Sequence, residues 1–267
     1  MKSLRFHYHM KIDFDMPVKD HRFTLKCLPA DNSRQQIEKL SYEVFPNRFI
    51  SYSEDSFGNK CIYGVCEEPH RGFLIDVEGI ALCGLADHEA ECKKEDATIF
   101  RYQTSHTVPG EKIKQYHRQL AERCDDRKES IYEHVMLYMH SIYSDYAYKS
   151  GTTQIATTAE EAFAQGYGVC QDYSHILISL LRMESIPCRY VTGMMLGEGL
   201  SHAWVEFYSD GKWIAVDPTN DTVVKDDHIR IAAGRDYSDC SINQGLFTGC
   251  DGKAKQYQNI CVSVEEI

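Results

Sequence analysis

The first residues of the chain alternate between apolar and polar side chains. From Leu4 to Phe14 every second residue is apolar, and the residues between them are polar. A period of two over this length is typical of a β-strand with one buried face. Shorter strand-like runs follow, separated by turn residues, at positions 21–28, 37–44, 48–53, 60–66 and 73–82. Strands at this spacing without helices between them predict a β-sandwich or barrel-like module.

The pattern changes character near Thr107. We expect helices over residues 111–123 and 130–146, then a third that begins at Thr158, whose pairing with Glu161 forms a capping box. Strand-like runs come after a fourth predicted helix, which spans residues 170–183; they cover positions 188–194, 202–208, 212–217, 229–233 and 260–264. Helices followed by strands predict an α+β fold with an antiparallel sheet. We therefore expect a β-rich domain over residues 1–106 and a second domain over residues 107–267.

One turn in the second domain has a strong signature. Asp210-Gly211 separates two strand-like runs, and Asp-Gly favours a two-residue hairpin turn. In the register that this turn sets, Trp204 faces Asp217. His202 and Asp217 then become diagonal neighbours on one face, about 7–8 Å apart by Cα and within reach of longer side chains.

Cys170 follows two glycines and opens the fourth predicted helix. Helix N-termini favour negative charge, and cysteines placed there have their pKa lowered from about 8.5 toward about 3.5–7.5. A histidine held by a carboxylate, as His202 and Asp217 would be, is the base that activates such a thiol. His175 is a poorer base because its offset of five residues turns it to another side. The alternatives are an ordinary buried thiol and a structural His–Asp pair.

Charge and cysteine content narrow the classes of function. The formal net charge of -11 argues against a nucleic-acid partner, because phosphate binding depends on Lys and Arg. The longest apolar stretch, residues 176–181, is too short to cross a bilayer, so we expect no membrane partner. The 11 cysteines form an odd number, and the first residues contain no apolar leader. Both features predict free thiols in the cytoplasm.

No pair of cysteines or histidines has the spacing of a zinc site. His7 and His9 share a predicted strand face, and His88 and Cys92 would share a helix face, but we expect ordinary surface or core roles for both pairs. No group of Asp and Glu has calcium-loop spacing. The sequence therefore predicts neither a metal nor another cofactor.

Three motifs in this order resemble the bacterial transglutaminase-like superfamily, a group related to transglutaminases and papain-like cysteine proteases. They are G-x-G-V-C-Q-D-Y at residues 166–173, S-H-A-W-V-E at 201–206 and W-x-x-x-D-P-T-N at 213–220. The β-rich first hundred residues resemble the N-terminal region of many bacterial members. The resemblance implies a papain-like or transglutaminase-like core in which Cys170, His202 and Asp217 form a catalytic triad.

The same resemblance implies attack of the thiolate on an amide carbonyl, with a thioester intermediate. We expect a protein or peptide substrate and hydrolysis of a peptide or isopeptide bond. Transglutamination is the alternative within this chemistry, and a non-catalytic peptide-binding module is the alternative outside it. Gln165 is a candidate second oxyanion donor or an ordinary surface residue. Trp204 is expected to shield the His–Asp pair or to serve as core.

Overall fold

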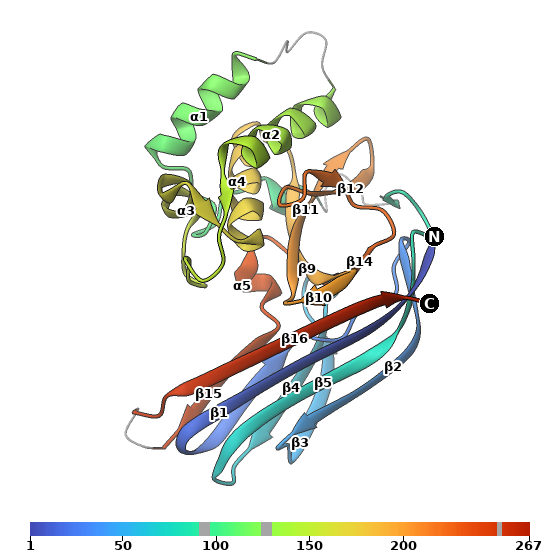
Figure 1. Ribbon diagram of the computed structural model, residues 1–267, viewed down its shortest axis with the longest axis vertical. Coiled ribbons are helices and arrows are strands. Elements are labelled where there is room, and N and C mark those ends of the chain that lie inside the picture. The colour runs from blue at the N-terminus through green and yellow to red at the C-terminus, as the bar shows by residue number, and fades with distance from the viewer. Residues whose placement is uncertain (91–96, 124–129, 250–252) are drawn as a thin grey trace.

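The computed structural model describes residues 1–90, 97–123, 130–249 and 253–267. Long strands lie side by side below a group of helices and a second sheet (Figure 1). Strands make up 47% and helices 22% of the structure, so the fold is sheet-rich α+β, as the sequence predicts. No helix within the described ranges is long and apolar enough to cross a membrane.

The first sheet has eight antiparallel strands organised around β1. They are β1 (Lys2–Leu25), β2 (Gln35–Phe45), β3 (Phe49–Glu54), β4 (Lys60–Cys66), β5 (His70–Cys83), β10 (Gly197–Gly199), β15 (Asn243–Thr248) and β16 (Gln256–Glu266). The first half of β1 pairs with β16 and β5, and its second half pairs with β15 and β4. The separate strand expected at residues 21–28 is therefore the far end of β1.

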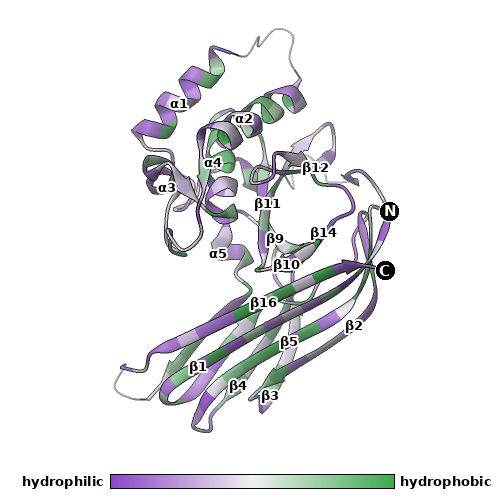
Figure 2. Cartoon of the chain, in the orientation of Figure 1, coloured by the Kyte–Doolittle hydropathy of each residue, from purple (hydrophilic) through white to green (hydrophobic). Residues whose placement is uncertain are grey.

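The alternation along β1 sets the core of this sheet. The apolar residues at every second position from Leu4 to Phe14 are at most 4% exposed. Apolar and polar residues also alternate along the long strands in Figure 2. A single hydrophobic cluster continues from these side chains into the helices and strands of the rest of the chain.

The first sheet is not built from the N-terminal residues alone. Strands β10, β15 and β16 follow residue 107 in sequence but belong to the first sheet. β16 alone pairs with β1 over eleven residue positions, from Leu4 opposite Glu266 to Phe14 opposite Gln256. The last two strands of the chain therefore pair with its first strand, and they connect the N-terminal sheet to the rest of the protein.

The second sheet has six strands and is covered by helices. Its strands are β6 (Glu89–Ala90), β9 (Cys188–Met195), β11 (His202–Ser209), β12 (Lys212–Asp217), β13 (Thr222–Val223) and β14 (His228–Gly234). The helices and short elements are η1 (Thr98–Arg101), α1 (Glu111–Ala121), α2 (Ile131–Asp145), β7 (Ala147–Tyr148), α3 (Ala159–Gln165), β8 (Tyr167–Gly168), α4 (Cys170–Met183) and α5 (Tyr237–Cys240). α4 is buried along almost its whole length and lies against β9 and β11. The capping box at Thr158 and Glu161 is confirmed.

The hairpin of β11 and β12 has the register that the sequence predicts. Ser209 pairs with Lys212, and the ladder continues to Val205 opposite Val216. Both central residues of the turn have positive φ, 51° at Asp210 and 81° at Gly211. A two-residue turn of this type matches the twist of the strands and favours Asp-Gly.

Replacing Gly211 with alanine should destabilise the protein by about 1 kcal/mol, because an L-residue is strained at positive φ. An added Cβ would meet no atom within 4 Å, so the loss would come from the backbone alone. Thermal unfolding measures the effect. Gly199→Ala is the matched control, since that site is equally open and lies outside the glycines with positive φ. Equal melting temperatures for the two variants would contradict the turn assignment.

Candidate active site

Cys170 is the first residue of α4, as the sequence predicts. The Asp172 carboxylate in the same turn accepts hydrogen bonds from the backbone N–H of Val169 and the Thr153 hydroxyl, both at 2.8 Å. Gly168 is required just before this turn, because a Cβ there would lie 2.4 Å from the Asp172 side chain. The G-x-G-V-C-Q-D motif therefore shapes and caps the helix start that presents the thiol.

His202 and Asp217 are in direct contact on the hairpin face. Nε2 of His202 lies 2.7 Å from Oδ2 of Asp217. The His202 side chain is 10% exposed and that of Asp217 is 0% exposed. The His202 ring also hydrogen-bonds the Cys170 sulfur, so thiol, imidazole and carboxylate stand in series. The carboxylate fixes the orientation of the ring that faces the thiol.

The two partners change the protonation of His202. Burial alone would lower the pKa of the imidazole, but hydrogen bonds to Asp217 and Cys170 outweigh burial and raise the pKa to about 10. Burial would likewise raise the pKa of Asp217, yet hydrogen bonds from His202 and His228 hold it well below its usual range. The arrangement favours a charged imidazolium beside an ionised carboxylate.

The turn after β12 supplies further donors to Asp217. Its Oδ1 accepts the backbone N–H of Thr219 at 2.9 Å and that of Asn220 at 3.3 Å. Its Oδ2 also accepts the Asn220 side-chain amide at 2.7 Å. The D-P-T-N motif is thus a turn that wraps its own carboxylate in hydrogen bonds.

His228, at the start of β14, is a site residue that sequence reasoning missed. Its side chain is 1% exposed, with Nε2 3.4 Å from Oδ2 of Asp217 and Nδ1 2.7 Å from Oδ1 of Asp227. Burial would lower the pKa of His228, but the bonds to these two carboxylates outweigh it and raise the pKa. His228 precedes the predicted strand 229–233, yet its approach to Asp217 depends on β14 pairing with β9, which no local signal reveals.

The donor atoms of His202, Asp217 and His228 lie within 4.8 Å of one another, a spacing that suits metal ligands. The oxygens of Asp217 already accept hydrogen bonds from the turn and from both rings. An ion here would have to displace those donors. We therefore interpret the cluster as a hydrogen-bond network centred on Asp217.

Trp204 lies between the two histidines and is 1% exposed. Its ring is stacked at 6.3 Å from that of His202 and edge-on at 5.1 Å from that of His228. It also packs with Val191 and Ala215 in a small buried cluster. Trp204 is thus part of the core and packs against both histidine rings.

Gln165 does not fit the positioning role expected for it. It is the last residue of α3, is exposed, and lies outside the residues that line the cleft at Cys170. Gly166 ends α3 with φ of 78° and redirects the chain before α4 begins. Gln171 lines the cleft instead. The sequence alone does not predict which glutamine lines the cleft, because the turn at Gly166 sets the path of the chain between α3 and α4.

His175 is excluded as the base by its surroundings. Burial lowers its pKa to about 3, and its Nε2 accepts the backbone N–H of Tyr237 at 3.2 Å. The neutral ring is thus committed to a structural bond inside the core. The prediction that His175 is a poorer base than His202 is confirmed.

Cys170 and His202 open onto a cleft of about 530 Å³ whose opposite wall is the first sheet. That wall includes Met10 and Phe14 of β1, Phe247 of β15 and Ile260 of β16. Among the described residues that line the cleft, none is Asp, Glu, Lys or Arg. In a chain of net charge -11, the described lining of this cleft thus contains no carboxylate. The wall formed by the first sheet carries mainly apolar and aromatic side chains, together with Gln256 and Gln258.

The free energy of unfolding should fall as the pH rises from about 6.5 to about 10. In this range the unfolded chain has released the His202 proton while the folded protein keeps it. Stability from this group is complete below pH 6.5 and declines by up to about 1.4 kcal/mol per pH unit. Urea unfolding of the wild type and His202→Asn across this pH range measures the difference between the two stability profiles. Parallel pH profiles for the two proteins would count against the shifted pKa.

Two family models match parts of this chain. The model of the transglutaminase-like superfamily matches residues 118–218, and that of the bacterial transglutaminase-like N-terminal region matches residues 4–81. A Mycobacterium leprae protein is 38% identical over 112 residues, which are 38% of this chain and 40% of that relative. A Mycobacterium tuberculosis protein is 28% identical over 255 residues, which are 85% of this chain and 75% of the relative.

Among solved structures, a candidate cysteine protease from Cytophaga hutchinsonii shares the fold. It aligns with a TM-score of 0.78 at 21% identity and covers 100% of this chain and 92% of its own. The two family matches together take in most of the strands from β1 to β5 and the hairpin that holds His202 and Asp217, whereas β15 and β16 lie outside them. The chain therefore belongs to the transglutaminase-like superfamily, with a bacterial transglutaminase-like N-terminal region ahead of its core.

Proposed function

We propose that this chain is a cysteine-dependent acyl-transfer enzyme that hydrolyses peptide or isopeptide bonds. The observation that carries the proposal is the His202 ring, which bonds Asp217 on one side and the Cys170 sulfur on the other. A thiol, an oriented base and a buried carboxylate in series are the parts of an activated nucleophile. They meet at the edge of a cleft large enough for a peptide side chain and its backbone.

The reaction would begin with the Cys170 sulfur attacking the amide carbonyl carbon. The first backbone N–H groups of a helix have no acceptor within it, and that of Cys170 is the natural donor to the developing oxyanion. As the C–N bond breaks, His202 gives its proton to the leaving amine, and the acyl group remains on Cys170 as a thioester. Water then attacks the thioester, its proton passes to His202, and the carboxylic acid leaves as Cys170 is released as a thiolate beside the protonated His202.

The cleft indicates the kind of residue that flanks the scissile amide. Its N-terminal wall offers apolar and aromatic surface, and the described lining carries no acidic or strongly basic side chain. Burying a positively charged substrate side chain here would cost free energy, because the described lining offers no carboxylate to pair with it. We propose a substrate with apolar or uncharged polar residues beside the cleaved bond.

Cys170 should react with iodoacetamide faster than Cys261 at neutral pH, by roughly tenfold or more, because a base and a helix N-terminus activate it. Of the eight described cysteines, these two are not buried, so Cys261 is an internal reference for access. Peptide mapping of alkylated protein measures both sites. His202→Ala should remove the advantage of Cys170 while leaving Cys261 unchanged.

Equal rates at Cys170 and Cys261 in the wild type would favour a non-catalytic peptide-binding module. Cys170→Ala is the matched control for any measured turnover, since it removes the sulfur and keeps the helix start. A peptidase activity that survives in Cys170→Ala would belong to a contaminant or to another site.

Hydrolysis and transamidation share the triad, and the acyl acceptor separates them. A glutamine peptide with apolar flanking residues is offered with and without a primary amine, and products are identified by mass spectrometry. We expect a cleaved or deamidated product whose amount changes little with the amine. Amine incorporation that replaces hydrolysis would identify a protein-glutamine transglutaminase instead.

A further inference from the structure

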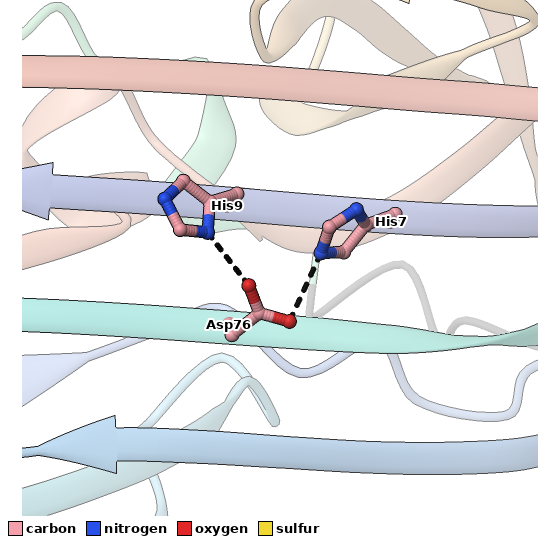
Figure 3. Close-up of side chains that lie close together, drawn as sticks. All are labelled: His7, His9 and Asp76. Carbon is pink, nitrogen blue, oxygen red and sulfur yellow. Dashed lines mark hydrogen bonds and ion pairs between the residues drawn. The ribbon is translucent and has the colours of Figure 1, made fainter.

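The outward face of β1 carries two histidines that the acyl-transfer chemistry does not use. His7 and His9 lie two residues apart, so both side chains leave the same face of the strand. Tyr8 between them points to the opposite face and lines the cleft at Cys170. Both imidazole rings turn toward Asp76 on the neighbouring strand β5 (Figure 3). This cluster therefore lies on the other side of the first sheet from the active site.

The three side chains already meet at one point. Nε2 of His7 is 2.9 Å from Oδ1 of Asp76, and Nδ1 of His9 is 2.6 Å from Oδ2. His9 and Asp76 are directly opposite in the strand register, so the backbone holds this pair together. The ligand atoms of all three residues lie within 4.8 Å of one another. The side chains are 31–47% exposed, which leaves the cluster open to an ion from solvent.

The spacing is close to that of a zinc shell. Zn²⁺ binds imidazole nitrogen at about 2.0–2.1 Å and carboxylate oxygen at about 2.0–2.2 Å, which puts neighbouring donors of a tetrahedron about 3.3 Å apart. The rings would have to move from Asp76 by about half an ångström, and the two ring nitrogens, which lie within 4.8 Å of each other, would have to reach the same spacing of about 3.3 Å. Exposed side chains allow such changes. The ion would replace the protons that each ring now shares with the carboxylate.

A fourth donor stands on the other side of β1. Cys261 of β16 is directly opposite His9 in the register and is exposed. Directly opposed residues have their Cβ atoms about 4.5–5.5 Å apart, so the thiol reaches the same face of the sheet beside His9. Thiolate, imidazole and carboxylate together are a ligand set that suits zinc.

The charges around the cluster favour a cation. Glu78 lies directly opposite His7 and adds a second carboxylate to this face. The two basic side chains that flank the histidines on β1 are already paired, Arg5 with Glu265 at 2.6 Å and Lys11 with Asp13 at 2.9 Å. A divalent ion would therefore meet net negative charge.

We propose that His7, His9 and Asp76 bind a divalent transition-metal ion of the zinc class. Cys261 lies outside this group of three and would have to turn toward the ion to serve as a fourth ligand. Nitrogen donors exclude a site built for Ca²⁺ or Mg²⁺, which take oxygen ligands. The ion would join β1 to β5, and through the thiol to β16. The inner faces of β1 and β16 form part of one wall of the cleft. The role of the ion is to stiffen the sheet, and the acyl-transfer chemistry does not depend on it.

Zinc chloride titrated into the full chain, freed of metal beforehand, tests the site by calorimetry. We expect one equivalent to bind and to raise the melting temperature. His9→Gln and Asp76→Asn should each weaken binding more than tenfold, because each removes a ligand. His140→Gln is the matched control, since His140 pairs with Asp221 on the surface without a second histidine and should bind zinc as the wild type does. Melting temperatures without zinc show that each variant is folded, and His7→Gln repeats the test at the third ligand.

Equal zinc affinity in the wild type, His9→Gln and Asp76→Asn would overturn the proposal. So would a loss of binding in His202→Asn, which would place the ion at His202, Asp217 and His228 instead. Cobalt(II) tests the fourth ligand, because a thiolate ligand gives a charge-transfer band. That band should vanish in Cys261→Ser, and its persistence would remove Cys261 from the site.

Discussion

The buried carboxylate of Asp217 is the group on which the rest of the site depends. Its side chain is inaccessible to solvent, and an unpaired charge there would be strongly destabilising. The protein meets this requirement with donors from three segments: the hairpin strand with His202, the start of β14 with His228, and the turn at Thr219 and Asn220. Satisfying one charge therefore fixes the position of three loops or strands and orients the histidine that faces Cys170.

The two sheets build the cleft together. α4 and β11 bring Cys170 and His202 to one wall, whereas β1, β15 and β16 supply the opposite wall. Because β15 and β16 follow the catalytic segment in sequence and pair with β1, the N-terminal region is held against the core by its own strands. The N-terminal region thus lines the cleft at Cys170 and gives it an apolar wall.

Local chemistry made much of this fold predictable. The alternation along β1, the capping box of α3 and the helix start at Cys170 are each signalled by neighbouring residues. The Asp210-Gly211 turn alone fixed the register that brings His202 to Asp217. The resemblance to the transglutaminase-like superfamily is visible in the sequence for the same reason, because each of its motifs is short and contiguous.

What escaped prediction depends on pairing between distant segments. His228 is brought to Asp217 by the pairing of β14 with β9. The strands β1 and β16 pair although they lie near opposite ends of the sequence. The third member of the His7 and His9 cluster, Asp76, is 67 residues from His9. Gln165 does not line the cleft, because Gly166 adopts a left-handed conformation and redirects the chain after α3. None of these relations has a signal within a short sequence window.

The central claim is that Asp217 keeps the His202 imidazole charged and directed at Cys170. NMR of protein labelled with ¹⁵N-histidine measures this directly, with the His202 resonance assigned from its loss in His202→Asn. We predict that the wild-type ring titrates far above 6.5, toward a pKa of about 10, and that Asp217→Asn brings the midpoint down. A midpoint near 6.5 in both proteins would contradict the claim.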